Sequence, residues 1–442
     1  MTTARIEPAL DGVRGATRIP HSKPHMQRAL LLSLLANAPS TIMNPAWSSE
    51  AESLFSSVRE FGLDVTGQDD RSLHLSGVGK SVKTGSAKVS VVGSAFNFRA
   101  MAAVACLSRG ETVLEGNAAM LKRPVTEYLS FIPELGGTLT DISDAGHLRT
   151  RIRGSSRLGG TATVDTQHSS QVLTSVLLIA PLADRPVRIR CTNAGAVGEG
   201  YIGLTESMMR RQGAGIERDG SSFVVHPSVY DAGMHELASD FTALSYLAGA
   251  VATAPRGSVT VDGYYPSELS SEREFLAVLE RLGIRTAYDP VERRLRIEKG
   301  DPAAEHVEID GRNIPTVVPT LAAIAPFVAA RVTLRNAAHV NNHKCRRVDV
   351  MIRELTRMGC WIEPKHGADG RVDGFTTVGR QAPAGGVALE SHGDHRIFLS
   401  LATAALGADR PSVLGGAEHL HASFPDFLTS LNTLGAGVGP AA

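Results

Sequence analysis

Six short polar segments hold the side chains of this chain that could carry out chemistry. Each combines cationic, hydroxyl, amide or imidazole groups and stands directly before a run that resembles a helix. The segments are Ile19–Arg28, Gly93–Arg99, Leu121–Pro124, Gln167–Gln171, His339–Arg347 and Gly393–Arg396. Backbone N–H groups at a helix N-terminus, together with nearby cations, form binding sites for anions. The segments therefore predict several anion-binding loops.

Each segment also has a simpler interpretation when it is taken alone. The segment with Lys23 and Arg28 could be a solvated basic loop, and Ser169 and Ser170 could cap a helix instead of binding phosphate. The cations that lead into the helix at Arg347 oppose the helix dipole, which favours a bound anion there. The anion-binding hypothesis therefore depends on whether the fold brings the segments together.

The elements that must position these segments recur six times along the chain. In each copy, an Ala- and Leu-rich helix precedes a turn and a short β-branched strand. The corresponding strand residues are Ile42, Val113, Val187, Val259, Val332 and Val413. A second helix ends on a glycine in every copy, as a left-handed helix cap requires. These glycines are Gly62, Gly136, Gly213, Gly283, Gly359 and Gly435. The spacing of the strand residues and the spacing of the glycines both indicate a repeat of about 73 residues.

Six such units predict an α/β protein made of two domains with three units each. The first helix of each unit is apolar on nearly all faces and should be buried, whereas the second is amphipathic and should lie outside it. The polar segments stand at equivalent ends of equivalent units, and a cleft between two domains is a common ligand site. We therefore expect a local cationic cluster that binds a small ligand with two or more anionic groups.

Composition excludes several classes of function. The 442 residues include 45 Lys and Arg against 45 Asp and Glu, so bulk attraction to nucleic acid or to a membrane surface is not expected. No apolar run reaches the roughly 18 residues of a membrane span. The four scattered cysteines, and His339 and His343 without a third ligand, favour reduced thiols and no metal or other cofactor. We expect a monomeric cytoplasmic protein whose partners are small anionic substrates.

The motifs, taken in order, resemble the enolpyruvyl transferases, and in particular the 5-enolpyruvylshikimate-3-phosphate (EPSP) synthase family, over nearly the whole chain. The matching motifs are Pro20-His-Ser-Lys23 with Arg28, Arg123-Pro124, Ser169-Ser-Gln171, Asp240–Tyr246, Ile314-Pro315, Arg347, Asp394-His-Arg396 and Phe424-Pro-Asp426. The resemblance implies a transferase with two inside-out α/β domains built from the six repeats. One domain would hold residues 1–20 and 238–442, and the other residues 21–237, and the two would close over the substrates.

The resemblance also assigns residues to two substrates. Phosphoenolpyruvate would be held by Lys23, Arg123, Arg347 and Arg396, with Gln171 between the two substrates. The phosphorylated acceptor would contact Arg28, Ser169, Ser170 and Tyr201. Relatives that use UDP-N-acetylglucosamine carry a cysteine in the loop that corresponds to Gly116–Arg123, and this chain has none there.

The chain departs from the family pattern at several catalytic positions. Thr316 replaces an aspartate near the acceptor hydroxyl, Lys344 replaces a glutamate, and Ala422 replaces a lysine. Pro24 and Gly198 replace serines on the acceptor side. The addition–elimination route needs a base at the attacking hydroxyl and an acid for the methylene carbon. The remaining candidates for proton transfer are Asp240, His343, Lys344, Asp394 and His395.

Three hypotheses follow from the retained cations and the altered catalytic positions. The first is an enolpyruvyl transferase that acts on another phosphorylated or nucleotide-linked polyol or cyclitol, in specialised metabolism. The second is a transferase or lyase that couples or eliminates at an activated cyclitol without phosphoenolpyruvate, which the changes at Lys344 and Ala422 favour. The third is a non-catalytic anion-binding relative, and the four retained donor-site cations argue against it.

Overall fold

The structure is a computed structural model that describes most of the chain. The described residues are 2–82, 87–91, 94–108, 110–121, 126–155, 157–167, 169–193, 197–301, 304–328, 331–379 and 383–441. They divide into two compact units. Unit 1 comprises Met1–Pro20 and Ala238–Ala442, and unit 2 comprises His21–Leu237. Each unit has three sheets of four strands within the described residues.

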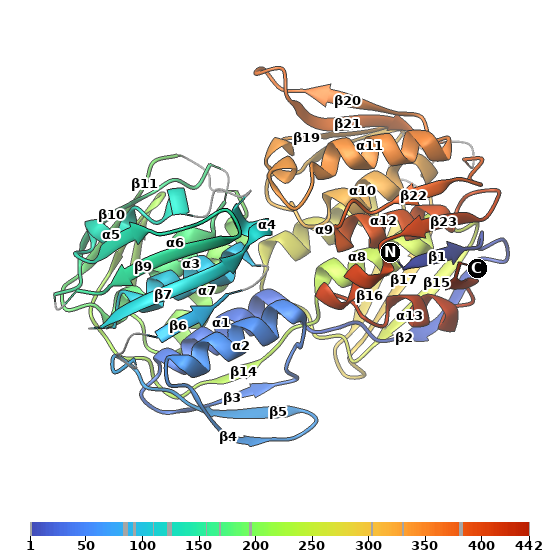
Figure 1. Cartoon of the computed structure of the whole chain (residues 1–442). Helices are drawn as coiled ribbons and strands as arrows, with labels where there is room; N and C mark the ends of the chain where they lie inside the picture. The colour runs from blue at the N-terminus through green and yellow to red at the C-terminus, as the bar shows by residue number, and fades with distance from the viewer. Residues whose placement is uncertain are drawn as a thin grey trace. The chain divides into compact units, whose positions relative to one another are not determined.

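In unit 2, helices lie on the inner faces of the sheets (Figure 1). The strands, in the order in which they pair, are β14 (Met234–Glu236), β3 (Pro39–Met43), β5 (Ser72–Ser76) and β4 (Asp64–Gln68); β6 (Ala87–Ser90), β7 (Glu111–Asn117), β9 (His147–Arg153) and β8 (Thr138–Asp141); and β10 (Gly160–Val164), β11 (Val187–Cys191), β13 (Ser222–Val225) and β12 (Ile216–Asp219). The helices are α1 (Lys23–Leu35), α2 (Ser49–Glu60), α3 (Ala95–Ala105), α4 (Ala118–Leu121), α5 (Phe131–Glu134), α6 (Gln171–Ile179) and α7 (Glu199–Arg211).

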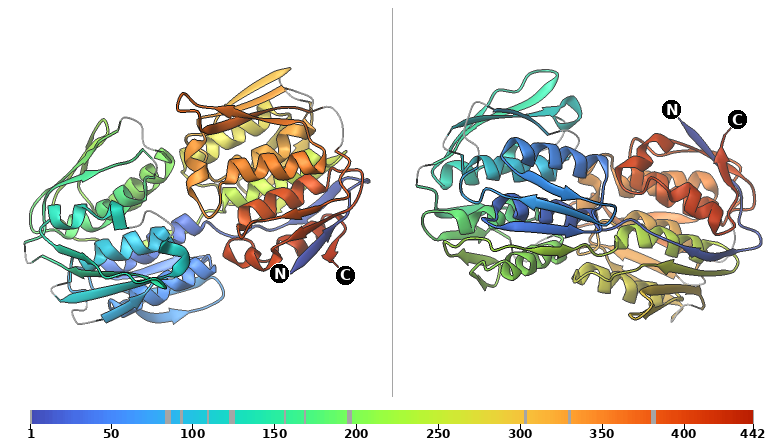
Figure 2. Two further views of the ribbon diagram at one scale, coloured as in Figure 1. Left: turned by 45° about the horizontal axis from the view of Figure 1, so that its top comes forward. Right: turned by 90° about the horizontal axis from the view of Figure 1, so that it is seen from below.

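Unit 1 has the same arrangement, which Figure 2 shows from two further directions. Its strands are β16 (Ile284–Asp289), β17 (Arg294–Lys299), β15 (Gly257–Asp262) and β2 (Val13–Thr17); β18 (His306–Asp310), β19 (Arg331–Arg335), β21 (Val372–Val378) and β20 (Ile362–His366); and β22 (Ala388–Glu390), β23 (Ser412–Gly415), β1 (Thr3–Ile6) and β24 (Val438–Pro440). Its helices are α8 (Phe241–Thr253), α9 (Ser270–Arg281), α10 (Val318–Ile324), α11 (Arg347–Met358), α12 (His395–Ala405) and α13 (Phe427–Thr433).

One strand pairing recurs in all six sheets. The strand that carries the predicted repeat residue pairs in parallel with one neighbour and antiparallel with the other, as β19 does with β18 and β21. Strands distant in sequence complete three of the sheets: β14 pairs with β3, β2 pairs with β15, and β1 lies between β23 and β24. The six-repeat prediction is confirmed, and the N-terminal strands belong to unit 1.

The inner and outer helices differ as the sequence predicts. Every residue of α3 and of α8 is buried, whereas α11 buries one face that includes Met351 and Leu355. The glycine after each outer helix has a positive φ: 113° at Gly62, 95° at Gly136, 86° at Gly213, 85° at Gly283, 101° at Gly359 and 88° at Gly435. All six ends therefore adopt the left-handed cap that glycine favours.

The outer helix of the second repeat is shorter than the others. It is reduced to α5, four residues long, after a single 3₁₀ turn at Thr126–Tyr128. Pro133 explains the short length, because proline lacks the N–H that would continue a helix and its ring obstructs the preceding turn. In the inner helices, Pro181 and Pro326 lie where α6 and α10 tighten into 3₁₀ turns.

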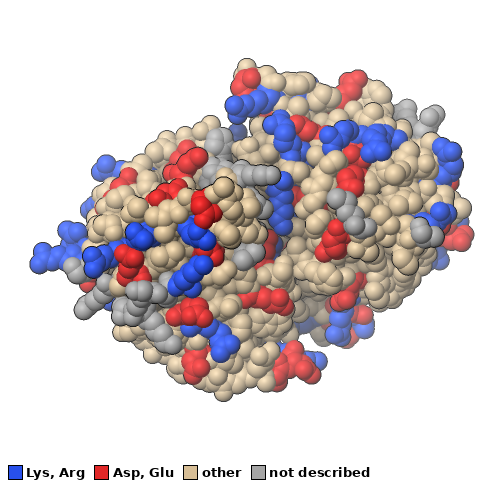
Figure 3. Space-filling model, viewed as in Figure 1, with Lys and Arg blue, Asp and Glu red and all other residues tan. Residues whose placement is uncertain are grey.

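Charged groups of both signs are dispersed over the visible surface. On the face in Figure 3, Lys and Arg side chains alternate with Asp and Glu, and neither sign dominates. No helix within the described ranges is both long and apolar enough to cross a membrane.

Candidate active site

Five of the six predicted polar segments lead into the N-termini of helices, and most of the sixth, Leu121–Pro124, lies outside the described residues. Lys23 is the first residue of α1, Gln171 of α6 and Arg347 of α11, and Asp394 is the N-cap of α12. The predicted residue Arg123 lies outside the described residues. The remaining predicted residues fall into a group in unit 2 and a group in unit 1.

The group in unit 2 is built around Arg28, which is 3% exposed on α1. Its guanidinium donates to Thr205 Oγ1 (2.8 Å), Pro24 O (3.0 Å), Tyr201 O (3.2 Å) and Thr174 Oγ1 (3.3 Å). Burial lowers its pKa to about 10, still high enough for a permanent charge at neutral pH. All four acceptors are uncharged oxygens, so the guanidinium charge is not neutralised by these bonds. Such a buried cation strengthens the local attraction for an anion.

The aromatic ring of Tyr201 and the ring of Phe96 lie beside this guanidinium. The Arg28 Cζ atom is 5.9 Å from the Tyr201 centroid and 5.4 Å from the Phe96 centroid. The predicted acceptor residues Arg28 and Tyr201 are therefore neighbours. Ser170 lies at the same end, where its hydroxyl donates to the carbonyl of Gly198 at 3.5 Å.

A second cation of unit 2, Lys23, forms an ion pair with Glu50 on α2, with an Nζ–Oε2 distance of 2.9 Å. Asn97 on α3 connects the same two helices, because its amide donates to the Glu50 carbonyl (2.7 Å) and its Oδ1 accepts from Gln27 (2.7 Å). Sequence reasoning identified Lys23 but not Glu50, which lies 27 residues further along the chain in no recognisable motif.

Gln171 is held by Arg99 from the first half of α3. Arg99 Nη1 donates to Gln171 Oε1 at 2.7 Å, and its Cζ atom stands 5.1 Å from the centroid of Tyr128. The hydroxyl of Ser169 accepts from the Gln171 backbone N–H at 3.2 Å. The segment Gly93–Arg99 was predicted as an anion loop, but the pairing of Arg99 with Gln171 was not.

The group in unit 1 is organised by Asp394, which is 0% exposed. Its Oδ2 accepts from Arg347 Nε at 2.7 Å and its Oδ1 from the Arg396 backbone N–H at 2.9 Å. Burial alone would raise the pKa of Asp394, but the charges of Arg347 and His395 and these two hydrogen bonds hold it well below its usual range. Asp394 is therefore a permanent carboxylate that orients Arg347, and it is unsuited to proton transfer.

Thr316 lies beside Arg396 and the start of α8. Its backbone carbonyl accepts from Arg396 Nη1 at 3.4 Å, and its hydroxyl accepts from Thr242 Oγ1 at 3.2 Å. Asp240, the N-cap of α8, accepts from the Thr242 and Ala243 N–H groups through Oδ1. Asp240 is only half-buried. Unlike the buried carboxylate of Asp394, the carboxylate of Asp240 can therefore be reached by solvent or by a ligand.

The other predicted proton-transfer residues differ in exposure. His343 is half-buried and Lys344 is exposed in the turn that precedes α11, whereas His395 is buried in the first turn of α12. Ala422 ends a 3₁₀ turn, Ala417–Ala422, which comes before Phe424. Across the described ranges, no group of three or more His, Cys, Asp or Glu side chains could hold a metal ion.

Comparison with known proteins identifies the family. The profile described as EPSP synthase (3-phosphoshikimate 1-carboxyvinyltransferase) matches residues 9–431. A 3-phosphoshikimate 1-carboxyvinyltransferase of Methanothrix thermoacetophila is 30% identical over 427 residues, which cover 96% of this chain and 97% of the relative. A 3-phosphoshikimate 1-carboxyvinyltransferase 2 of Halalkalibacterium halodurans is 27% identical and covers 90% of this chain and 87% of its own.

A solved structure has the same fold. The EPSP synthase of Acinetobacter baumannii superposes with a TM-score of 0.82 at 19% sequence identity, with all of both chains covered. The predicted architecture of two inside-out α/β domains is thereby confirmed. The family assignment made from the motifs is also confirmed, because the family profile spans nearly the whole chain. The chain belongs to the EPSP synthase family of enolpyruvyl transferases.

Proposed function

We propose that this enzyme transfers the carboxyvinyl group of phosphoenolpyruvate to a hydroxyl of a phosphorylated or nucleotide-linked polyol, such as a cyclitol, other than shikimate 3-phosphate. The observation that carries the proposal is a contrast within unit 1. The Arg347–Asp394 pair and Arg396 are retained, whereas Thr316, beside Arg396, cannot act as the carboxylate base of the family pattern. In unit 1, these donor-side arginines are kept, whereas the position of the expected base on the acceptor side is changed.

In unit 1, Arg347 and Arg396 would hold the donor. Arg347 uses Nε for Asp394, and its two Nη groups suit a carboxylate or phosphate. The family resemblance assigns Lys23 and Arg123 to the same substrate. The charge of Arg28, which has only uncharged acceptors among the described residues, would favour an anionic group of the acceptor, together with the hydroxyls of Ser169 and Ser170 and the ring of Tyr201.

The reaction joins the two substrates by addition and then elimination. The acceptor hydroxyl loses its proton as its oxygen bonds to C2 of phosphoenolpyruvate, and the methylene carbon takes up a proton. The adduct then loses a proton from that methyl group and releases phosphate, which leaves an enol ether. Asp240 is our candidate for the group that accepts the hydroxyl proton, because Asp394 is committed to Arg347.

Phosphate release tests the proposal. The protein is incubated with phosphoenolpyruvate and a panel of phosphorylated cyclitols and nucleotide-linked polyols, with shikimate 3-phosphate as the comparison. Turnover of a panel member at a higher kcat/KM than shikimate 3-phosphate is expected. If no acceptor releases phosphate, carboxyvinyl transfer is rejected, and efficient turnover of shikimate 3-phosphate would reject the altered acceptor.

Two sets of variants sharpen this test. Asp240→Asn retains the helix cap, since asparagine also caps helices, and should lower kcat by about 10²–10⁴-fold while leaving phosphoenolpyruvate binding unchanged in calorimetry. The triple variant Thr316→Asp, Lys344→Glu and Ala422→Lys should gain turnover of shikimate 3-phosphate. Reaction of an activated cyclitol in the absence of phosphoenolpyruvate, with no calorimetric binding of phosphoenolpyruvate, would instead support the coupling or elimination hypothesis.

A further inference from the structure

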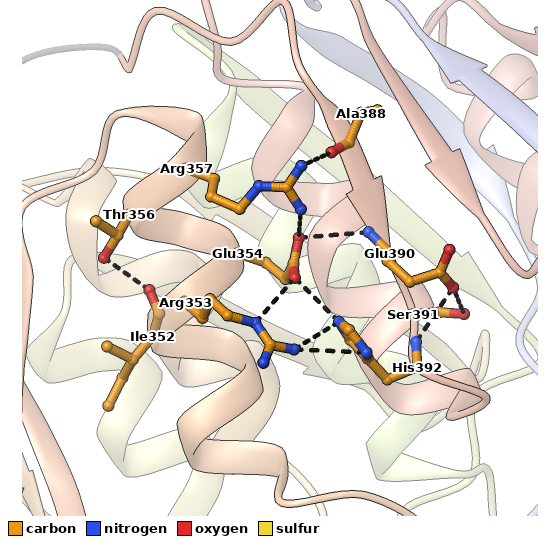
Figure 4. Close-up of polar contacts among 9 residues, drawn as sticks. All are labelled: Ile352, Arg353, Glu354, Thr356, Arg357, Ala388, Glu390, Ser391 and His392. Carbon is orange, nitrogen blue, oxygen red and sulfur yellow. Dashed lines mark hydrogen bonds and ion pairs between the residues drawn. The ribbon is translucent and has the colours of Figure 1, made fainter.

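A buried carboxylate on α11 has no role in the reaction described above. Glu354 is 1% exposed and accepts from Arg357 Nη1 (2.7 Å), Arg353 Nε (3.3 Å) and the Glu390 backbone N–H (3.4 Å), and it contacts His392 Nε2 at 3.0 Å (Figure 4). Burying a charge is costly unless it is fully paired, and here every contact joins α11 to itself or to residues 390–392. The carboxylate therefore ties the helix to one particular segment.

The contacts between α11 and this segment form a series along one face of the helix. Arg357 Nη2 donates to the Ala388 carbonyl at 2.7 Å, Glu354 contacts Glu390 and His392, and Arg347 donates to Asp394 at 2.7 Å. Glu354 lies seven residues after Arg347, which is two helical turns, so both side chains project from the same face. The segment from Ala388 to Asp394 is thus fixed to the helix at both ends and in the middle.

The middle of this segment has a demanding backbone conformation. His392 and Gly393 have φ values of 51° and 73°, and such values are uncommon for a residue other than glycine. Conformations of this kind persist where the surroundings fix them. The surroundings here are Glu354, on the imidazole, and Glu390, whose Oε1 accepts from the His392 backbone N–H at 3.3 Å.

The imidazole Nε2 has two polar neighbours, Glu354 Oε1 at 3.0 Å and Arg353 Nη2 at 2.8 Å. It cannot donate to the first and accept from the second at the same time. We assign the Nε2 proton to the bond with Glu354, because a buried carboxylate needs the donor more than the exposed Arg353 needs an acceptor. Burial would raise the pKa of Glu354, but the His392 bond and the charge of Arg357 bring it below its ordinary value.

The segment ends at the residue that orients the arginines of unit 1. Asp394 follows the turn directly, and its own N–H donates to the Ser391 carbonyl at 3.0 Å. A shift of the turn would therefore move the carboxylate that binds Arg347 Nε and the Arg396 N–H. We propose that Glu354 and His392 are positioning residues that hold the 391–394 turn so that Arg347 and Arg396 meet phosphoenolpyruvate in the correct geometry. The proposal rests on the proposed function, through the donor role given to the two arginines.

Calorimetry of the full chain with phosphoenolpyruvate tests the proposal. Glu354→Gln and His392→Asn should each weaken binding by about 10-fold to 100-fold, because small displacements of positioning groups have effects of this size. Asparagine tolerates positive φ, so His392→Asn removes the imidazole with little backbone penalty. The double variant should weaken binding by less than the product of the two single effects, because both changes act on the same Glu354–His392 contact.

Matched controls separate positioning from general loss of stability. Glu308→Gln removes an exposed carboxylate on β18 and His366→Asn an exposed histidine on β20, and both should retain wild-type binding. If Glu354 and His392 served stability alone, their variants would lower Tm and leave the Kd of phosphoenolpyruvate unchanged, and that result overturns the proposal. If Glu354→Gln does not fold, His392→Asn alone tests the proposal. The His392 side chain is 31% exposed, and in this variant Glu354 still pairs with Arg357, so no buried charge loses its last partner.

Hydrogen exchange keeps the two proposals distinguishable. Faster exchange confined to residues 391–396 in both variants supports the fixed turn whether or not a ligand binds. If the wild-type protein does not bind phosphoenolpyruvate, the proposed function fails, and unchanged exchange at 391–396 would then reject the positioning role as well. If the wild-type protein binds phosphoenolpyruvate and both variants bind it equally well, only the positioning role is rejected.

Discussion

Each unit buries an arginine on one of its helices, but the two units balance the charge of that arginine differently. Arg28 in unit 2 is 3% exposed and donates to neutral oxygens, whereas Arg347 in unit 1 is 4% exposed and pairs with the carboxylate of Asp394. A cation without a counter-ion favours an incoming anion by charge. A cation held by a carboxylate instead contributes orientation, because part of its charge is already compensated. The same scaffold thus supports one site that depends on charge and one that depends on geometry.

The largest effect is expected when the counter-ion in unit 1 is removed. Asp394→Asn retains a helix-capping side chain but leaves the Arg347 charge buried without its partner. We expect a loss of about 3–5 kcal/mol in the free energy of unfolding of unit 1. The chain has two tryptophans, Trp47 in unit 2 and Trp361 in unit 1, so urea unfolding in a Trp47→Phe background reports on unit 1. The exposed change Asp369→Asn is the control, and an equal loss there would contradict the role of the ion pair.

Acid should weaken unit 2 through two buried histidines. Burial and nearby positive charge lower the pKa of His25 to about 3 and that of His235 to about 4, so both stay neutral in the folded state. The unfolded chain takes up protons below pH 6.5, so stability is complete above that pH and falls as the pH decreases. Each histidine should cost about 2 kcal/mol at pH 5.

Unfolding followed through Trp47 in a Trp361→Phe background checks the acid effect. His235→Gln should reduce the dependence on pH between 6.5 and 5 by about half. Asp394 in unit 1 remains charged over this range because its pKa is far lower. A stability of unit 2 that does not change between pH 7 and pH 5 would show that the histidines are not held neutral.

A third variant removes Arg28 of unit 2, whose acceptors among the described residues are all uncharged. The described acceptors of Arg28 are uncharged, so Arg28→Met should cost only about 1–3 kcal/mol, mainly from the lost hydrogen bonds to Thr205 Oγ1 and Pro24 O. The same variant should abolish turnover of any phosphorylated acceptor if Arg28 attracts its anionic group. Urea unfolding through Trp47 and the phosphate-release assay measure the two effects. A loss as large as that of Asp394→Asn would remove the contrast between the two arginines.

Sequence patterns predicted the repeats and the loops better than the contacts within the site. Hydrophobic periodicity and the six glycines are local signals, and they located the helix ends at which Lys23, Gln171, Arg347 and Asp394 stand. The short α5 could also have been anticipated from Pro133.

The partners of the site residues depend on tertiary packing. Glu50 lies beside Lys23, Arg99 beside Gln171, and Glu354 beside His392, across separations of 27 to 72 residues. No spacing rule connects such residues, because the packing of separate helices and turns brings them together. For the same reason, the sequence could not reveal that the acceptors around Arg28 are neutral.

The smallest effect compares equivalent caps of the two units. Gly213 in unit 2 and Gly435 in unit 1 both have positive φ, which costs a non-glycine residue about 1–2 kcal/mol. A Cβ atom at Gly435 would meet nothing within 4 Å, whereas at Gly213 it would lie 2.8 Å from Asp231 Oδ2. Gly435→Ala should therefore show the conformational cost alone, and Gly213→Ala should show that cost plus the movement of a flexible carboxylate. Urea unfolding of each variant measures these costs. As the control, adding Asp231→Ala to Gly213→Ala should reduce the cost of the alanine at 213 to that of Gly435→Ala. A difference that persists in this control would mean that the two caps are not energetically equivalent, and that the repeats differ in their backbone as well as in their charges.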